Sequence, residues 1–124
     1  MKILVVDDEE DVKTLFEQRF RKEIRAGEFD FAFSNSGEAA LEYLKGQNLE
    51  AILILSDINM PGISGIELLK QIRSKSPKSP PIVMMITAYG DAENHDQAMN
   101  LGANDFLTKP LDFADLKQKL KNSL

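Results

Sequence analysis

The chain has 124 residues, a formal net charge of −5, 43% hydrophobic residues and no cysteine. This length and composition fit one globular domain over residues 1–124 and exclude both a disulfide framework and a thiolate metal site. The negative net charge argues against nucleic acid as a direct partner. The sequence shows neither a long apolar run nor a signal peptide, so we expect a cytoplasmic protein that does not bind membranes.

Short apolar runs alternate five times with amphipathic segments along the chain, and each run predicts a β-strand. The runs are Ile3 to Val6, Phe29 to Phe33, Ala51 to Leu55, Ile82 to Ile86, and Phe106 to Leu107. The first, third and fourth contain almost no polar residue, which is typical of strands covered on both faces. The second alternates in part, as an edge strand with one wetter face does.

Apolar residues spaced three or four apart predict a helix after each strand. The stripes are Val12, Leu15, Phe16, Phe20 and Ile24; Leu41 and Leu44; Leu68, Leu69 and Ile72; Ala98 and Met99; and Phe113, Leu116 and Leu120. Asn35 or Ser36 would cap the second helix, and Asp112 the fifth. Five strands alternating with five helices predict an α/β fold with a doubly wound parallel sheet.

Polar residues stand at the carboxyl ends of four predicted strands. The segments are Asp7-Asp8-Glu9, Ser56-Asp57, Thr87-Ala88 and Thr108-Lys109-Pro110. In a parallel sheet these ends share one edge, and ligands bind at this edge where the strand order reverses. We therefore expect three carboxylates, a hydroxyl and an ammonium group to converge.

Each of these residues alone has an ordinary structural explanation. Asp7 or Asp8 could cap the first helix, Asp57 could belong to a turn, Thr87 to a strand, and Lys109 to a solvated strand end. Together they are harder to explain, because clustered carboxylates repel one another and need a neutralising cation. Mg²⁺ prefers oxygen ligands and is held by few carboxylates, so the pattern predicts a magnesium site.

The joint order of these motifs resembles the response-regulator receiver family over the whole chain. The matching segments are Val5-Val6-Asp7-Asp8-Glu9, Asp57-Ile58-Asn59-Met60-Pro61-Gly62, Thr87-Ala88, Thr108-Lys109-Pro110, Gly65 and Gly102-Ala103. The resemblance implies a flavodoxin-like sheet of strand order 2-1-3-4-5 with the site between the first and third strands.

The resemblance also implies a role for each site residue. Asp57 would be the phosphoacceptor and would ligate Mg²⁺ together with Asp8. Asp7 would act largely through a bound water, and the backbone carbonyl of Asn59 would complete the protein ligands.

A second group of residues would respond to the phosphoryl group. Lys109 would pair with it, and Thr87 would move toward it after transfer. Phe106 occupies the position of the family's switching aromatic residue, without the hydroxyl that many members have. Lys109-Pro110 would be a cis peptide, and Tyr89 would partly shield the phosphoryl group from water.

The function implied is a phosphorylation-controlled switch rather than an enzyme acting on other substrates. A sensor histidine kinase or histidine phosphotransfer protein would donate the phosphoryl group to Asp57. The fourth helix, fifth strand and fifth helix would then present a changed surface to an effector or a C-terminal output domain. The sequence leaves open which of these outputs is used.

Two other functions compete with this interpretation. A magnesium-dependent phosphohydrolase also uses an aspartate nucleophile, but Asn59 stands where those enzymes carry a second aspartate. A receiver that has lost phosphorylation would be a pure interaction module, which the complete set of site residues argues against. His95, the only histidine, is expected at a solvated or half-buried helix position with no catalytic role.

Overall fold

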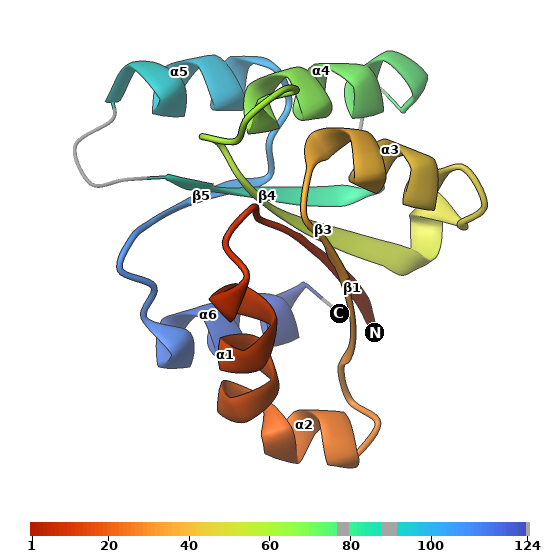
Figure 1. Ribbon diagram of the computed structural model, residues 1–124, viewed down its shortest axis with the longest axis vertical. Helices are drawn as coiled ribbons and strands as arrows, with labels where there is room; N and C mark the ends of the chain where they lie inside the picture. The colour runs from red at the N-terminus through yellow and green to blue at the C-terminus, as the bar shows by residue number, and fades with distance from the viewer. Residues whose placement is uncertain (77–79, 88–91, 124) are drawn as a thin grey trace.

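The computed structural model describes residues 1–76, 80–87 and 92–123 (Figure 1). Within these residues the strands are β1 (Lys2–Val6), β2 (Asp30–Ser34), β3 (Ile52–Asp57), β4 (Ile82–Thr87) and β5 (Asp105–Thr108). The helices are α1 (Asp11–Arg19), α2 (Arg21–Arg25), α3 (Gly37–Leu44), the 3-10 helix η1 (Leu49–Ala51), α4 (Gly65–Lys75), α5 (Ala92–Asn100) and α6 (Phe113–Asn122). None of the described helices is long and apolar enough to cross a membrane.

The strands form one parallel sheet in the order β2-β1-β3-β4-β5, which confirms the predicted fold class and strand order. The register is continuous across the sheet. Val6 pairs with Ser56 at the ends of β1 and β3, and Thr87 pairs with Thr108 at the ends of β4 and β5. The carboxyl ends of the strands therefore meet at one edge, where the site was expected.

Two layers of helices cover the sheet, with α3, α4 and α5 on one face and α1, α2 and α6 on the other (Figure 1). Alternate residues of β3 supply the two cores. Ile52 and Ile54 belong to one apolar cluster, and Leu53 and Leu55 belong to the other. This alternation explains the uninterrupted apolar run in the sequence, because both faces of a central parallel strand are buried.

The first predicted helix is interrupted, so the described chain has six α-helices instead of the five expected. Phe20 leaves the helical conformation, with φ −111° and ψ 23°, and separates α1 from α2. Its ring is fully buried and lies 5.8 Å from the Phe29 ring and 5.4 Å from the Phe31 ring. The predicted stripe is also wrong at Leu15 and Ile24, which are 38% and 36% exposed.

Helix capping follows the sequence in two of the predicted places. The Ser36 hydroxyl accepts a hydrogen bond from the Ala39 backbone N–H, 3.0 Å away, so Ser36 rather than Asn35 caps α3. The Asp112 carboxylate accepts from the backbone N–H groups of Ala114 and Asp115 at the start of α6. These bonds satisfy donors that the first turn of a helix leaves without a partner.

Candidate functional site

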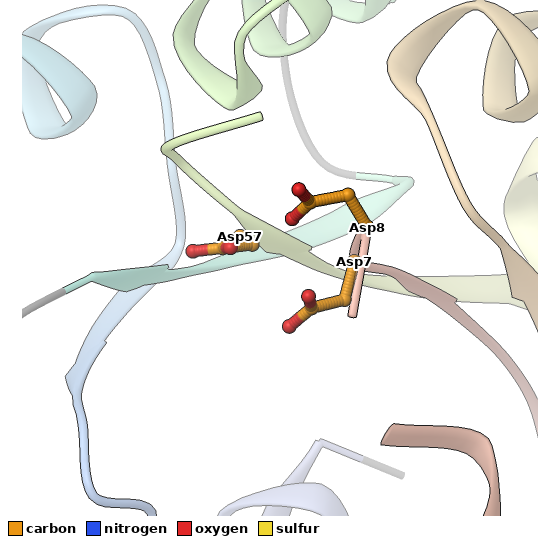
Figure 2. Close-up of side chains that lie close together, drawn as sticks. All are labelled: Asp7, Asp8 and Asp57. Carbon is orange, nitrogen blue, oxygen red and sulfur yellow. The ribbon is translucent and has the colours of Figure 1, made fainter. Parts of the chain in front are cut away.

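Asp7, Asp8 and Asp57 come together at the ends of the two central strands. Each offers a carboxylate oxygen, and these oxygens all lie within 4.8 Å of one another. Figure 2 shows the three carboxyl groups pointing into the same space from β3 and from the residues after β1. The arrangement follows from the β1–β3 register, because the residue before Asp7 pairs directly with the residue before Asp57.

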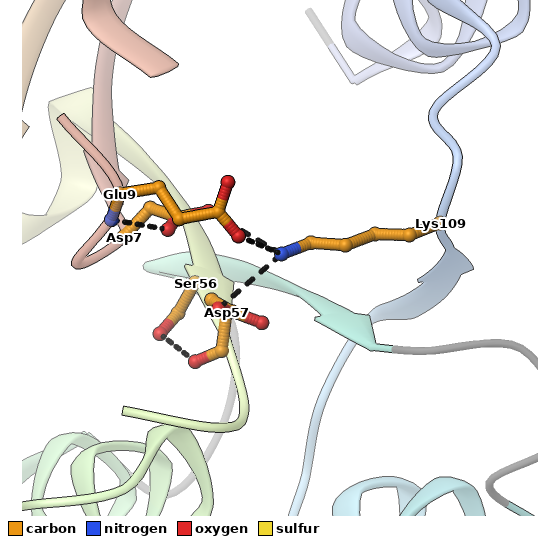
Figure 3. A network of polar contacts seen from close by, with 5 residues as sticks. All are labelled: Asp7, Glu9, Ser56, Asp57 and Lys109. Carbon is orange, nitrogen blue, oxygen red and sulfur yellow. Dashed lines mark hydrogen bonds and ion pairs between the residues drawn. The ribbon is translucent and has the colours of Figure 1, made fainter. Parts of the chain in front are cut away.

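Lys109 reaches this cluster from the segment after β5 (Figure 3). Its Nζ atom lies 3.4 Å from Asp57 Oδ2, 3.7 Å from Asp7 Oδ2 and 3.5 Å from Glu9 Oε1. The Lys109 backbone N–H donates to the Thr87 carbonyl over 2.7 Å, which fixes the start of this segment against β4. The Lys109-Pro110 peptide bond is cis, as predicted.

The environment of Asp57 and Asp7 disfavours the ionised form of these two carboxyl groups. Burial raises the pKa of Asp57, and the nearby charge of Asp7 raises it further, against the opposing effect of Lys109. Burial also raises the pKa of Asp7. Burial alone would lower the pKa of Lys109, but the charges of Asp57, Asp7 and Glu9 outweigh it and leave that pKa raised.

This arrangement excludes the alternative that Asp7 or Asp8 caps α1. The N-cap residue of α1 is Glu10, and no side-chain hydrogen bond caps that helix. Asp7 instead accepts a bond from the Glu9 backbone N–H, 3.0 Å away, and its side chain is only 7% exposed. Its carboxylate is therefore held at the site.

The backbone beyond Asp57 is fixed by close packing against Gly65, the first residue of α4. The Gly65 N–H donates to the Ile58 carbonyl over 2.9 Å, and the Ile58 N–H donates to the Ile86 carbonyl over 3.0 Å. A Cβ atom at Gly65 would overlap the Asp57 carbonyl oxygen and lie 2.8 Å from the Ile58 Cα. Only glycine allows the two backbone segments to approach this closely. In the sequence, Gly65 was noted only as a residue that matches the family pattern.

Three further residues were predicted at the site: Thr87, Asn59 and Tyr89. Thr87 is fully buried at the end of β4, and its movement toward a phosphoryl group stays a prediction. Asn59 is exposed in the loop after β3, and ligation by its carbonyl stays a prediction. The predicted shielding by Tyr89 falls on a residue outside the described ranges, as does Ala88.

Two contacts were not found by sequence reasoning. Glu9 pairs with Lys109, and the His95 ring lies 4.8 Å from the Phe106 ring in an edge-to-face arrangement. His95 is otherwise exposed on α5, as predicted, while Phe106 is half-buried. Neither contact has a local sequence signal, because each joins residues that are distant along the chain.

The acidic cluster has the donor set and the charge that a hard divalent cation requires. Three carboxylates, those of Asp7, Asp8 and Asp57, offer oxygens to a cation, and Lys109 pairs with the carboxylates of Asp7, Asp57 and Glu9. Burial is the main cause of the raised pKa values of Asp7 and Asp57, and the charges of neighbouring carboxylates add to it. Mg²⁺ takes oxygen ligands and keeps several waters, so these residues fit it.

A doubly wound sheet with this acidic cluster and lysine at its switch point defines the receiver class of signalling domains. The chain belongs to that family, since the family model of the response regulator receiver domain matches residues 3–121. It is therefore a phosphorylation-controlled switch of two-component signalling.

Individual relatives agree with this assignment. The chain is 34% identical over 121 residues to the response regulator RppA of Synechocystis, covering 98% of this chain and 49% of that protein. It is 36% identical to the chemotaxis protein CheY-3 of Vibrio cholerae, covering 97% of this chain and 88% of that one. The crystal structure of the NtrX receiver domain from Brucella abortus superposes with a TM-score of 0.81 at 27% identity, covering 98% and 97%. The chain thus spans about half the length of RppA.

Proposed function

We propose that Asp57 is the phosphoacceptor of this switch. The observation that carries the proposal is the position of its carboxylate, which is 6% exposed, next to Asp7 and Asp8 and 3.4 Å from the Lys109 ammonium group. A carboxylate in this setting can act as a nucleophile toward phosphorus. Phosphoryl transfer then depends mainly on positioning and charge neutralisation, which the surrounding residues supply.

The proposed metal at this site is Mg²⁺. Asp8 and Asp57 would hold it directly, Asp7 would act largely through a bound water, and the Asn59 carbonyl would complete the protein ligands. When bound, the ion neutralises charge on the phosphoryl oxygens. The support is the cluster of three carboxylates, whose ligand oxygens lie within 4.8 Å of one another.

The residues of the chain would perform the transfer themselves. An Asp57 oxygen forms a bond to phosphorus while the bond from phosphorus to the donor nitrogen breaks, and that nitrogen keeps the electron pair. Lys109 pairs with the phosphoryl oxygens, and the Thr87 hydroxyl donates to one of them. In a separate step a water attacks phosphorus, and the bond from phosphorus to the Asp57 oxygen breaks. Inorganic phosphate leaves with the oxygen of that water, and Asp57 keeps the electron pair as a carboxylate. The chain would thus catalyse only its own phosphorylation and dephosphorylation.

The conformational response would run from Thr87 to Phe106. Thr87 and Phe106 lie on the neighbouring strands β4 and β5, and Thr87 accepts the backbone hydrogen bond of Lys109. Phe106 is half-buried against His95 of α5, so a change at Thr87 can alter the surface formed by α5, β5 and α6. A two-state element of this kind is what a phosphorylation switch requires.

The proposed donor is a sensor histidine kinase or a histidine phosphotransfer protein, which must bring its phosphorylated side chain to Asp57. A groove of about 560 Å³ adjoins the site and is lined by α1 residues and by the segment from Lys109 to Phe113. Leu15 in this groove is 38% exposed, so its apolar side chain is open to a partner. Docking there would cover Leu15 and place the donor beside Lys109. The downstream partner would be an effector protein or a C-terminal output domain.

The test is phosphorylation with acetyl phosphate and Mg²⁺, followed by intact-mass and peptide mass spectrometry. We expect the mass of one phosphoryl group on Asp57 and none in the Asp57→Asn variant, with Asp30→Asn as an exposed aspartate control. A chain without added phosphate, or with phosphate on another residue, would contradict the proposal. Multiple turnover on a generic phosphate ester would instead indicate a phosphohydrolase.

A further inference from the structure

We propose that Glu9 sets the phosphodonor preference of this site by competing for Lys109 and by repelling donors in proportion to their negative charge. Glu9 would thereby favour phosphoryl groups carried on nitrogen, with one net negative charge, over dianionic acyl phosphates. The inference rests on the proposed phosphorylation of Asp57, and it assigns a specificity-determining role to a residue outside the predicted site.

The geometry places Glu9 as an equal competitor for the lysine. The Lys109 Nζ atom is 3.5 Å from Glu9 Oε1 and 3.4 Å from Asp57 Oδ2 (Figure 3). The position of Glu9 is set by its own backbone N–H, which donates to Asp7 Oδ1. A phosphoryl group arriving at Asp57 must therefore take Lys109 from a carboxylate that is already paired with it.

The stability of the protein should depend little on this ion pair. The Glu9 side chain is 65% exposed, and exposed ion pairs contribute little to the free energy of unfolding. The effect on a charged donor is a separate matter, because Glu9 Oε1 lies within about 7 Å of Asp57 Oδ2 through their shared contact with Lys109. At that distance one unit of charge changes a rate constant by about threefold in water at low ionic strength.

Two small donors differ in the charge that Glu9 would sense. With acetyl phosphate, a dianion at neutral pH, Asp57 attacks phosphorus and acetate leaves with the electron pair of the broken P–O bond. With phosphoramidate, a monoanion whose nitrogen is protonated, the same attack releases neutral ammonia. The reactions share the nucleophile and the product on Asp57, so their rate ratio isolates the charge of the donor.

The experiment measures phosphorylation rate constants for both donors at saturating Mg²⁺ in the unmodified protein and in Glu9→Gln. We expect the ratio of the acetyl phosphate rate to the phosphoramidate rate to rise about threefold in Glu9→Gln at low ionic strength. The rise should disappear at about 1 M salt, where the Debye length is about 3 Å. Glu10→Gln is the matched control, because it removes the same charge from the next residue, which makes no described ion pair with Lys109.

A binding measurement gives a readout that does not depend on turnover. NMR titration with beryllofluoride and Mg²⁺ should show about threefold tighter anion binding in Glu9→Gln than in Glu10→Gln. An unchanged donor ratio, an equal change in Glu10→Gln, or a change that persists in high salt would overturn the role of Glu9. If the unmodified protein takes no phosphate on Asp57 from either donor, the proposed function itself fails, and that result is distinct from an unchanged ratio.

Discussion

The contact between Gly65 and the end of β3 offers a direct test of how the fold positions the phosphoacceptor. In Gly65→Ala the added Cβ would overlap the Asp57 carbonyl oxygen and lie 2.9 Å from the Asp57 carbonyl carbon and 2.8 Å from the Ile58 Cα. All of these atoms belong to the backbone, so no side-chain rotation can relieve the overlap. Either α4 or the end of β3 must move.

The size of the effect follows from these contacts. Overpacking a well-ordered site costs about 1–3 kcal/mol, and a clash with backbone atoms should lie toward the upper end. A displacement of Asp57 by about 1 Å relative to Lys109 should lower the phosphorylation rate by roughly a hundredfold. We therefore expect losses of about 2–3 kcal/mol in the free energy of unfolding and of about two orders of magnitude in rate.

The assay combines urea unfolding with the rate of acetyl phosphate labelling. Gly46→Ala is the control, because a Cβ at Gly46 would meet nothing within 4 Å and its φ is not positive. That variant should be neutral or more stable by up to about 1 kcal/mol, with an unchanged labelling rate. Equal stability and equal rates in the two variants would refute the argument that this close approach fixes Asp57.

Three further predictions concern the charges of the site and the buried arginine. Mg²⁺ at about a hundred times its Kd should raise the free energy of unfolding of the unmodified protein by about 2.7 kcal/mol. Thermal unfolding with and without Mg²⁺ measures this gain, and the Asp57→Asn variant should lose most of it. Because the pKa values of Asp7 and Asp57 are raised, the folded protein holds these protons more tightly than the unfolded chain does. Without metal, the free energy of unfolding of the unmodified protein, relative to that of Asp57→Asn, should therefore fall as the pH rises from about 4 to 7. Urea unfolding midpoints of the two proteins measure this difference. A difference that rises with pH would contradict the raised pKa of Asp57. Arg73→Ala should cost about 2–4 kcal/mol in urea unfolding, because the guanidinium donates to the carbonyls of Gly102 and Pro81 and to the Asn104 side chain. Lys70→Ala, an exposed change on the same helix, should cost less than about 0.5 kcal/mol.

The carboxylate cluster was predictable from sequence because strand ends in a parallel sheet share one edge. Asp7, Asp8 and Asp57 each follow an apolar run, and the sheet brings their oxygens within 4.8 Å. Lys109 was predictable for the same reason, although its distances to the carboxylates were not. The specific roles of these residues, and those of Thr87 and Asn59, stay predictions that the experiments above test.

The sequence by itself determined the alternation of strands and helices, since hydrophobic periodicity and capping residues act over a few neighbouring positions. It indicated Asn35 or Ser36 as the N-cap of one helix and Asp112 as that of another, and its uninterrupted apolar runs identified the central strands. Only the tertiary structure decided the break at Phe20, the pairing of Glu9 with Lys109 and the contact of His95 with Phe106. Each of these depends on which side chains meet across the folded sheet, and no short-range pattern encodes the distance between residues that are far apart along the chain.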